Sequence, residues 1–438
     1  MTRLRLATND IFRSLKIRNF RLFFYGQLIS QIGNWITLIA QTLLVLELTD
    51  SGVALGLLAA VQFGPILIFG AFSGLIADRS DKRKLLITVQ TFAMVQSFVL
   101  GALAFMDSPP VWAIYVVAGF GGLATAFDNP ARRSFVVEMV PEAEVTNAVS
   151  LNSALMTGAR IVGPALGGLL VASLGYGWAF WADGLTYVAV IAGLRLIDPT
   201  KLRSAPVQER GKGQIRAGLR YAMSMPDLRV PLIMMALIGT LAFNFSTVLP
   251  LFTTRDLGGS DLTFSLLMSV VSVGSLAGAL AAARRKDLSV DLVSGGAVAF
   301  GISMLLLALS PNQPVAFAVG VIVGVTSITF MTTSTAIVQL RANASMRGRV
   351  LALQAIVFLG STPIGGPIVG AISEHFGARW ALGLGALAAM AAGAYGLTSV
   401  RRAQRVALTE DVAAGVAADV AADMGEGPLP VRPPIPAG

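Results

Sequence analysis

Long apolar stretches separated by short polar connections dominate the chain. Each is close to the roughly 20 residues that a helix needs to cross a bilayer. The runs are continuous, whereas β-barrel strands alternate, and a backbone in lipid must satisfy its own hydrogen bonds, which favours helices. The pattern predicts an all-α membrane protein with 12 transmembrane helices. The stretches lie near 21–47, 53–77, 85–106, 111–127, 146–173, 178–197, 231–253, 262–283, 290–310, 314–338, 349–373 and 379–400.

The predicted domain organisation is two pseudo-symmetric six-helix bundles, residues 21–197 and 230–400. A polar, basic linker, 198–229, joins them. The segment 1–20 precedes the first bundle. The tail 401–438 is rich in Ala, Val, Asp, Gly and Pro, a composition that predicts disorder.

Lysine and arginine lie almost entirely on one side of the predicted membrane. That side holds 30 of the 33 basic residues, including those of both terminal segments and the linker. The positive-inside rule therefore predicts that both termini are cytoplasmic and, with the short loops, that the chain is a multi-pass protein of a bacterial inner membrane. The net charge of +9 then needs no nucleic-acid partner.

Composition excludes several classes of protein. Hydrophobic residues make up 55% and charged residues 13%, whereas soluble domains carry about 25% charged residues. The chain has no cysteine and a single histidine, His375. A thiolate zinc site, a His-rich metal site and a catalytic thiol are therefore excluded. Without GxSxG, HExxH or P-loop motifs, we expect no enzyme, no metal and no cofactor.

Two short motifs recur at nearly constant offset in the two halves. A GPxxG pattern in the fifth stretch returns 203 residues later in the eleventh, and the Asn34 position matches Asn244. This predicts an internal duplication, which is typical of transporters. Small residues with proline supply either a helix bend or a close-packing face. The motif residues are Gly163, Pro164, Gly167, Gly168, Gly366, Pro367 and Gly370.

The loop between the second and third stretches carries the most specific motif. Residues 74–84 read GLIADRSDKRK and resemble the major facilitator superfamily signature G-x-x-x-D-R-x-G-R-R-K, with Asp81 in place of glycine. The stretches 128–132, 159–164 and 347–350 resemble one bacterial branch, that of the enterobactin exporter and related macrolide and drug efflux proteins. The resemblance covers about residues 10–400.

The resemblance implies a cytoplasmic gate. Asp78 would meet the amino-terminal end of the eleventh helix near Gly348 and pair with Arg132 or Arg133, holding the cytoplasmic side shut in the outward-facing state. The alternative is a solvated turn that only sets topology. The gate residues are Gly74, Asp78, Arg79, Lys82, Arg83 and Arg132.

Charges inside the spans are costly, about 2.5–3.5 kcal/mol each or more. Three stand out: Asp128, Arg160 and Asp183. We expect Arg160 to pair with one of the two aspartates. The pair would be either a proton-coupling site or a permanent structural ion pair.

Neutral polar residues repeat at helical spacing in three stretches. They predict either the lining of a central cavity or hydrogen bonds between helices. The residues are Gln27, Gln31, Asn34 and Gln41 in the first stretch, Thr240, Asn244 and Thr247 in the seventh, and Thr326, Thr329 and Thr333 in the tenth.

Together these features predict a secondary active transporter working by alternating access. A largely uncharged cavity and the resemblance favour export of an amphipathic small molecule, a drug or siderophore, by proton antiport. The alternative is an importer or a lipid or metabolite facilitator on the same fold. The expected partners are the substrate, protons and the lipid bilayer, and we expect a monomer.

Overall fold

Twelve helical spans in a computed structural model are long and apolar enough to cross a membrane. The structure describes residues 12–203, 214–284 and 288–423, and every regular element within these ranges is a helix. Six spans precede the segment between Leu196 and Pro226 and six follow it, which confirms the predicted fold class. Parts of the predicted segments 1–20, 198–229 and 401–438 lie outside the described residues.

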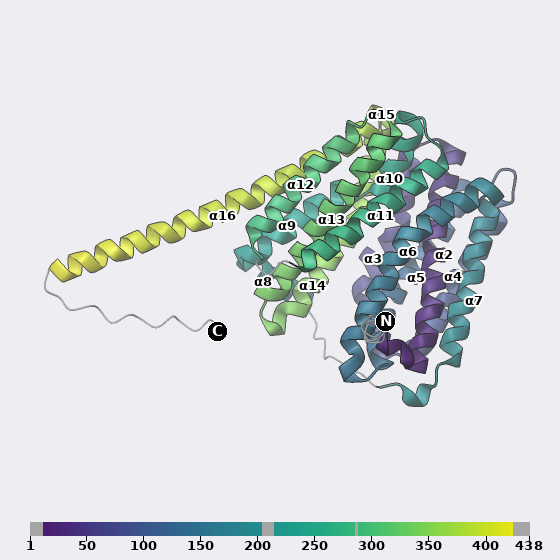
Figure 1. The fold of residues 1–438 in the computed structure, drawn as a ribbon, viewed down its shortest axis with the longest axis horizontal. Helices are drawn as coiled ribbons and strands as arrows, with labels where there is room; N and C mark the ends of the chain where they lie inside the picture. The colour runs from purple at the N-terminus through teal and green to yellow at the C-terminus, as the bar shows by residue number, and fades with distance from the viewer. Residues whose placement is uncertain (1–11, 204–213, 285–287, 424–438) are drawn as a thin grey trace, which may run out of the picture.

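The two sets of helices lie side by side in Figure 1, the first in purple to teal and the second in green to yellow. The first set consists of η1 (Arg13–Lys16), α2 (Arg18–Thr49), α3 (Gly52–Arg79), α4 (Lys82–Ala104), α5 (Val111–Glu138), η2 (Glu142–Glu144), α6 (Val145–Leu174), α7 (Tyr176–Leu196) and η3 (Pro199–Lys201). The second consists of α8 (Gln214–Ser224), α9 (Pro226–Leu241), α10 (Phe245–Leu251), η4 (Phe252–Asp256), α11 (Asp261–Ala283), α12 (Val290–Ala308), α13 (Gln313–Arg341), α14 (Ala344–Leu359), α15 (Thr362–Phe376) and α16 (Ala378–Asp423).

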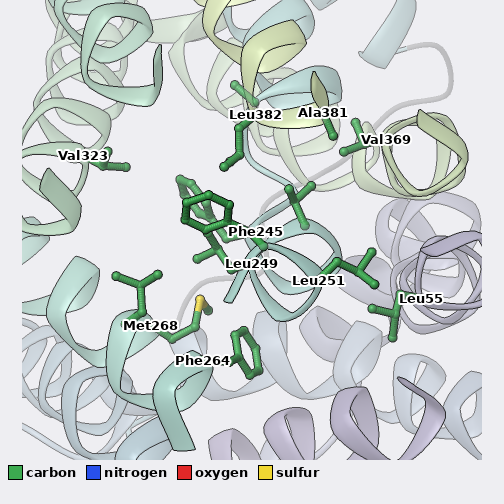
Figure 2. Close-up of a cluster of buried hydrophobic side chains, with 14 of the residues drawn as sticks. Leu55, Phe245, Leu249, Leu251, Phe264, Met268, Val323, Val369, Ala381 and Leu382 are labelled. Carbon is green, nitrogen blue, oxygen red and sulfur yellow. The ribbon is translucent and has the colours of Figure 1, made fainter. Parts of the chain in front are cut away.

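The seventh span is broken at Asn244, where the sequence predicted a continuous helix. Asn244 has φ −95° and ψ 43°, and its side-chain amide donates to the carbonyl of Thr240 at 2.6 Å. An asparagine that bonds the backbone in this way competes with the helical hydrogen bonds. The short helix α10 that follows is embedded in the largest apolar cluster, and Figure 2 shows its residues Phe245, Leu249 and Leu251 at the centre of that cluster.

The eleventh span is also in two pieces, α14 and α15. The connection is Gly360–Ser361, and Pro363 occupies the first turn of α15. Pro363 has no backbone N–H to donate to the carbonyl four residues earlier, that of Leu359, and α14 ends at Leu359. The Ser361 hydroxyl donates to the Phe358 carbonyl at 2.8 Å.

Glycines bring the two halves into backbone contact. Helix α3 packs along α15, and α6 packs along α11. A side-chain carbon at Gly366 would lie 3.0 Å from the carbonyl oxygen of Gly56, and one at Gly56 would lie 2.8 Å from the Cα of Pro367. Without a hydrophobic force between helices in lipid, small residues that permit this approach hold helices together.

Both GPxxG motifs lie in such packing faces. Helix α6 runs without interruption through Pro164. Gly163 faces the Trp35 side chain, and a side-chain carbon at Gly167 would lie 3.1 Å from the Cα of Ile36, so this motif seats α6 on α2. Gly168 faces Ser265 on α11. The structure thus shows that these glycines pack against neighbouring helices. A helix bend at the prolines that serves transport stays a prediction.

The last helix continues past the predicted end of the twelfth span. Helix α16 runs to Asp423 and extends away from the bundle as the long yellow helix of Figure 1. The prediction of disorder from residue 401 is therefore wrong for 401–423. Alanine is the strongest helix former, and this segment contains no proline and a single glycine, Gly415. Residues 424–438 lie outside the described part of the chain.

We predict that Gly56→Ala lowers the apparent Tm of the purified protein, because its methyl group would force α3 away from α15. Overpacking of this kind costs roughly 1–3 kcal/mol. Gly64→Ala on the same helix is the matched control, since no atom lies within 4 Å of a side-chain carbon there. Thermal unfolding in detergent checks both; equal Tm values for the two variants would contradict the packing role.

Candidate functional site

A cavity of about 320 Å³ opens among the helices of the first half. Three of the residues predicted to line a cavity, Gln31, Asn34 and Gln41, are in its wall. Gln27 is buried close by and accepts a hydrogen bond from Gln31 at 3.2 Å. The other polar wall residues are Thr37, Gln62, Gln90, Gln96, Thr125, Asp128, Asn129, Arg132 and Tyr187.

The polar residues predicted for the second half are not in the wall of this cavity. Four of their hydroxyls donate to carbonyls of the preceding turn of their own helix, and Thr326 also contacts Ser303 at 2.8 Å. Such bonds satisfy a hydroxyl in lipid without a ligand. These residues are Thr240, Thr326, Thr329 and Thr333, while Thr247 and Asn244 are buried. Their role in a cavity stays a prediction.

An ion pair sits in the cavity wall on α5. The Arg132 guanidinium lies 3.4 Å from the Asp128 carboxylate, with the two side chains 7% and 13% exposed. Gln90 of α4 donates to the other Asp128 oxygen at 2.7 Å, and Arg132 donates to Asn129 at 2.8 Å. Pairing and hydrogen bonds are what make buried charges tolerable.

Asp183 lies beneath the wall, fully buried between α2, α4 and α7. Its carboxylate accepts hydrogen bonds from the hydroxyls of Thr37 at 2.7 Å, Ser97 at 2.7 Å and Thr186 at 3.3 Å. A side chain at Gly33 would collide with this carboxylate. The glycine on α2 therefore makes room for the aspartate on α7.

Arg160, at the centre of α6, does not pair with Asp128 as predicted, because Arg132 takes that position. The Arg160 guanidinium carbon lies 5.9 Å from the centroid of the Trp35 ring. A cation over an aromatic face is attracted by the ring's electrons. Its Nε is enclosed and has no hydrogen-bond partner among the described residues.

The predicted pairing of Arg160 with Asp183 is also wrong, because α2 stands between them. Asp183 lies against Gly33, whereas Arg160 lies over Trp35. Two residues apart on an α-helix means about 200° of rotation. The two charges therefore face opposite sides of α2.

The loop motif has a defined structural role for several of its residues. Asp81, the departure from the superfamily pattern, caps α4 by accepting from the Lys84 backbone at 3.1 Å. Lys82 pairs with Glu138 at the end of α5 at 2.6 Å, both nearly buried. Arg83 donates to the carbonyls of Leu194 and Arg195 at 2.7 and 2.8 Å, so it closes the carboxyl end of α7.

Three of the remaining gate residues lie in the last six residues of helix α3, and the fourth, Arg132, lies on α5. Gly74 is buried, Asp78 is partly buried and Arg79 is the last helical residue. Arg132 lies six residues, about 9 Å of helix rise, inside the end of α5 and is paired with Asp128. The structure places Arg132 in the cavity wall, and its role in the gate stays a prediction.

Polar contacts join the two halves on the predicted outer side. Arg255 forms an ion pair with Asp50 at 2.9 Å. The Gly52 backbone donates to Glu374 at 2.5 Å, and Tyr176 donates to Asp261 at 3.2 Å. The first two contacts accompany the glycine interface of α3 and α15, and the third joins α7 to α11.

Sequence reasoning missed several wall residues. Gln62 of α3, Gln90 and Gln96 of α4 and Tyr187 of α7 line the cavity. Their signal was present, because a glutamine inside an apolar span needs a partner. They were missed because none of them belongs to a set of polar residues that repeats at helical spacing. The Lys82–Glu138 pair was equally visible as two charges at adjacent helix ends.

The fold is that of a major facilitator superfamily transporter. A bacterial homolog of the human lysosomal transporter Spinster, solved inward-facing and occupied, superimposes with a TM-score of 0.67 at 16% identity, covering 89% of this chain and 97% of that chain. A POT family transporter in complex with a thioalcohol-conjugated peptide gives a TM-score of 0.73 at 10% identity, covering 88% and 96%. Likenesses at this identity establish the fold alone.

The chain belongs to the transmembrane secretion effector family, whose model matches residues 10–428. It is 25% identical over 361 residues to the staphyloferrin A transporter of Staphylococcus aureus, covering 82% of this chain and 90% of that protein. It is 25% identical to macrolide efflux protein A of Streptococcus pyogenes (80% and 89%) and 26% identical to the multidrug efflux pump Tap of Mycolicibacterium fortuitum (81% and 90%). The chain is thus a transporter and not an enzyme.

We predict that Arg132→Gln lowers the apparent Tm more than the double variant Asp128→Asn/Arg132→Gln does. Removing one partner of a buried pair costs about 3–5 kcal/mol, because the other charge is left uncompensated, and neutralising both removes that penalty. A double-mutant cycle of thermal unfolding measures the coupling. Additive effects of the two substitutions would show that the ion pair contributes nothing.

Proposed function

We propose that this transporter exports an amphipathic small molecule by alternating access, driven by proton antiport. The observation that carries the proposal is the cavity wall. It combines neutral amide side chains and apolar surface with one buried ion pair, Asp128–Arg132. The efflux and siderophore relatives named above support the same substrate class.

Alternating access requires two halves that can rock against each other around the cavity. Each half meets the other along narrow glycine faces, α3 on α15 and α6 on α11. The polar contacts at Asp50–Arg255 and Gly52–Glu374 join the halves on the predicted outer side. We propose that they hold that side closed while Asp78 and its loop act when the cytoplasmic side closes.

Asp128 is the proposed proton carrier. It is the acidic residue in the cavity wall, and it holds Arg132 by an ion pair. Protonation would neutralise the carboxylate and free the arginine, which couples proton uptake to the electrostatics of the site. Asp183 is the second candidate, but three hydroxyl groups already satisfy its carboxylate.

The alternative proposal is an importer or a lipid or metabolite facilitator, since the fold does not fix direction or substrate. We place the protein in a bacterial inner membrane with both termini cytoplasmic, on the distribution of basic residues. We expect it to work as a monomer.

We predict that amphipathic drugs or siderophores release protons from liposomes that carry the purified protein and an imposed pH gradient. Asp128→Asn should abolish this flux, because an asparagine cannot carry the proton. A trapped pH dye follows the internal pH. The matched control is Asp107→Asn, an exposed aspartate in the loop after α4, which should behave like the wild type.

Asp183→Asn separates the two candidate carriers in the same assay. Flux lost in Asp183→Asn and kept in Asp128→Asn would move the proton site to α7. Substrate movement that ignores the pH gradient and survives both substitutions would overturn antiport and favour a facilitator.

A further inference from the structure

Arg160, at the centre of α6, has no acidic partner in the described part of the chain. Asp128 and Arg132 neutralise each other. Asp183 accepts three hydroxyl hydrogen bonds on the far side of α2. Arg160 has only the face of Trp35, and its Nε has no acceptor. An unpaired charge at mid-membrane costs free energy, and such charges commonly mark functional sites.

Arg160 lies directly beside the cavity. Trp35, beneath its guanidinium, lines the cavity, as does Met156, one helical turn before Arg160 on α6. Met156 also contacts the Arg132 guanidinium at 3.6 Å. The two arginines therefore flank the same stretch of wall, but only one of them is neutralised.

Two buried amide donors in or near the cavity wall lack an acceptor, whereas one wall acceptor, the Oε1 of Gln90, lacks a donor among the described residues. Gln41, in the cavity wall, accepts from Gln62 at 2.8 Å, yet its own Nε2 is buried without an acceptor. The Nε2 of Gln27 is likewise buried without one. Buried donors are normally satisfied, so these groups favour a ligand that brings oxygen acceptors.

We propose that Arg160 binds the carboxylate of the transported molecule, so that the site selects anionic over neutral amphiphiles. The inference rests on the proposed transport function and specifies its substrate class. A carboxylate would accept charge-assisted hydrogen bonds from the guanidinium, while the apolar part of the molecule packs on Trp35 and the apolar wall. The charge of Arg160 would then be compensated whenever substrate is bound.

The test compares two probes that differ only in charge, N-dansylleucine and its neutral carboxamide. Their binding to the full-length protein in detergent is titrated by dansyl fluorescence. We expect the wild type to bind the carboxylate about ten-fold more tightly or better, as a charge-assisted bond would give. Arg160→Gln should remove this preference and leave carboxamide affinity unchanged, whereas Arg160→Lys should keep most of it.

Arg220→Gln, an exposed arginine of α8, is the control and should retain the full preference. Equal binding of the two probes by the wild type would overturn the proposal even if the Arg160 variants failed to fold. A preference that persists in a folded Arg160→Gln protein would also overturn it.

Proton flux driven by the carboxamide separates this inference from the transport function. Flux without charge preference would refute the role of Arg160 and leave antiport standing. Preference without flux would retain the site and refute antiport.

Discussion

Close approach of helix backbones at glycine is the constraint on which the rest of the structure depends. In lipid there is no hydrophobic driving force for helices to associate, so their packing relies on complementary shape. Gly56 and Gly366 let the backbones of α3 and α15 touch, and Gly163 and Gly167 do the same for α6 and α2. The contact between α6 and α2 joins two of the helices that line the cavity.

The polar interior follows from this packing. Gly33 lets α7 place a carboxylate against α2, and that carboxylate then draws hydroxyl donors from α2, α4 and α7. On α5, Asp128 and Arg132 are one helical turn apart and compensate each other in the cavity wall. In the cavity wall, opposite charges thus neutralise each other over a short distance. Arg160, beside that wall, has no acidic partner in the described part of the chain, and this contrast is why we assign it a role in binding.

Much of the architecture was predictable from the sequence, because span length and apolar composition follow directly from bilayer thickness. The family followed from the loop motif at 74–84. The helix breaks at Asn244 and at Gly360–Ser361 were not predicted. Hydropathy registers neither a side chain that bonds its own backbone, as at Asn244, nor the missing N–H of Pro363. The partner of Arg160 was predicted wrongly, because hydropathy cannot tell which face of α2 meets α6 and which meets α7.

The extension of α16 beyond the membrane gives the last span a long arm. From Ser399 to Asp423 the helix continues for 24 residues, about 36 Å at 1.5 Å per residue. A tilt of about 10° in the span would move the far end of such an arm by about 6 Å. Small rearrangements inside the bilayer are thereby converted into displacements on the scale of a side chain's reach, at a point well outside it.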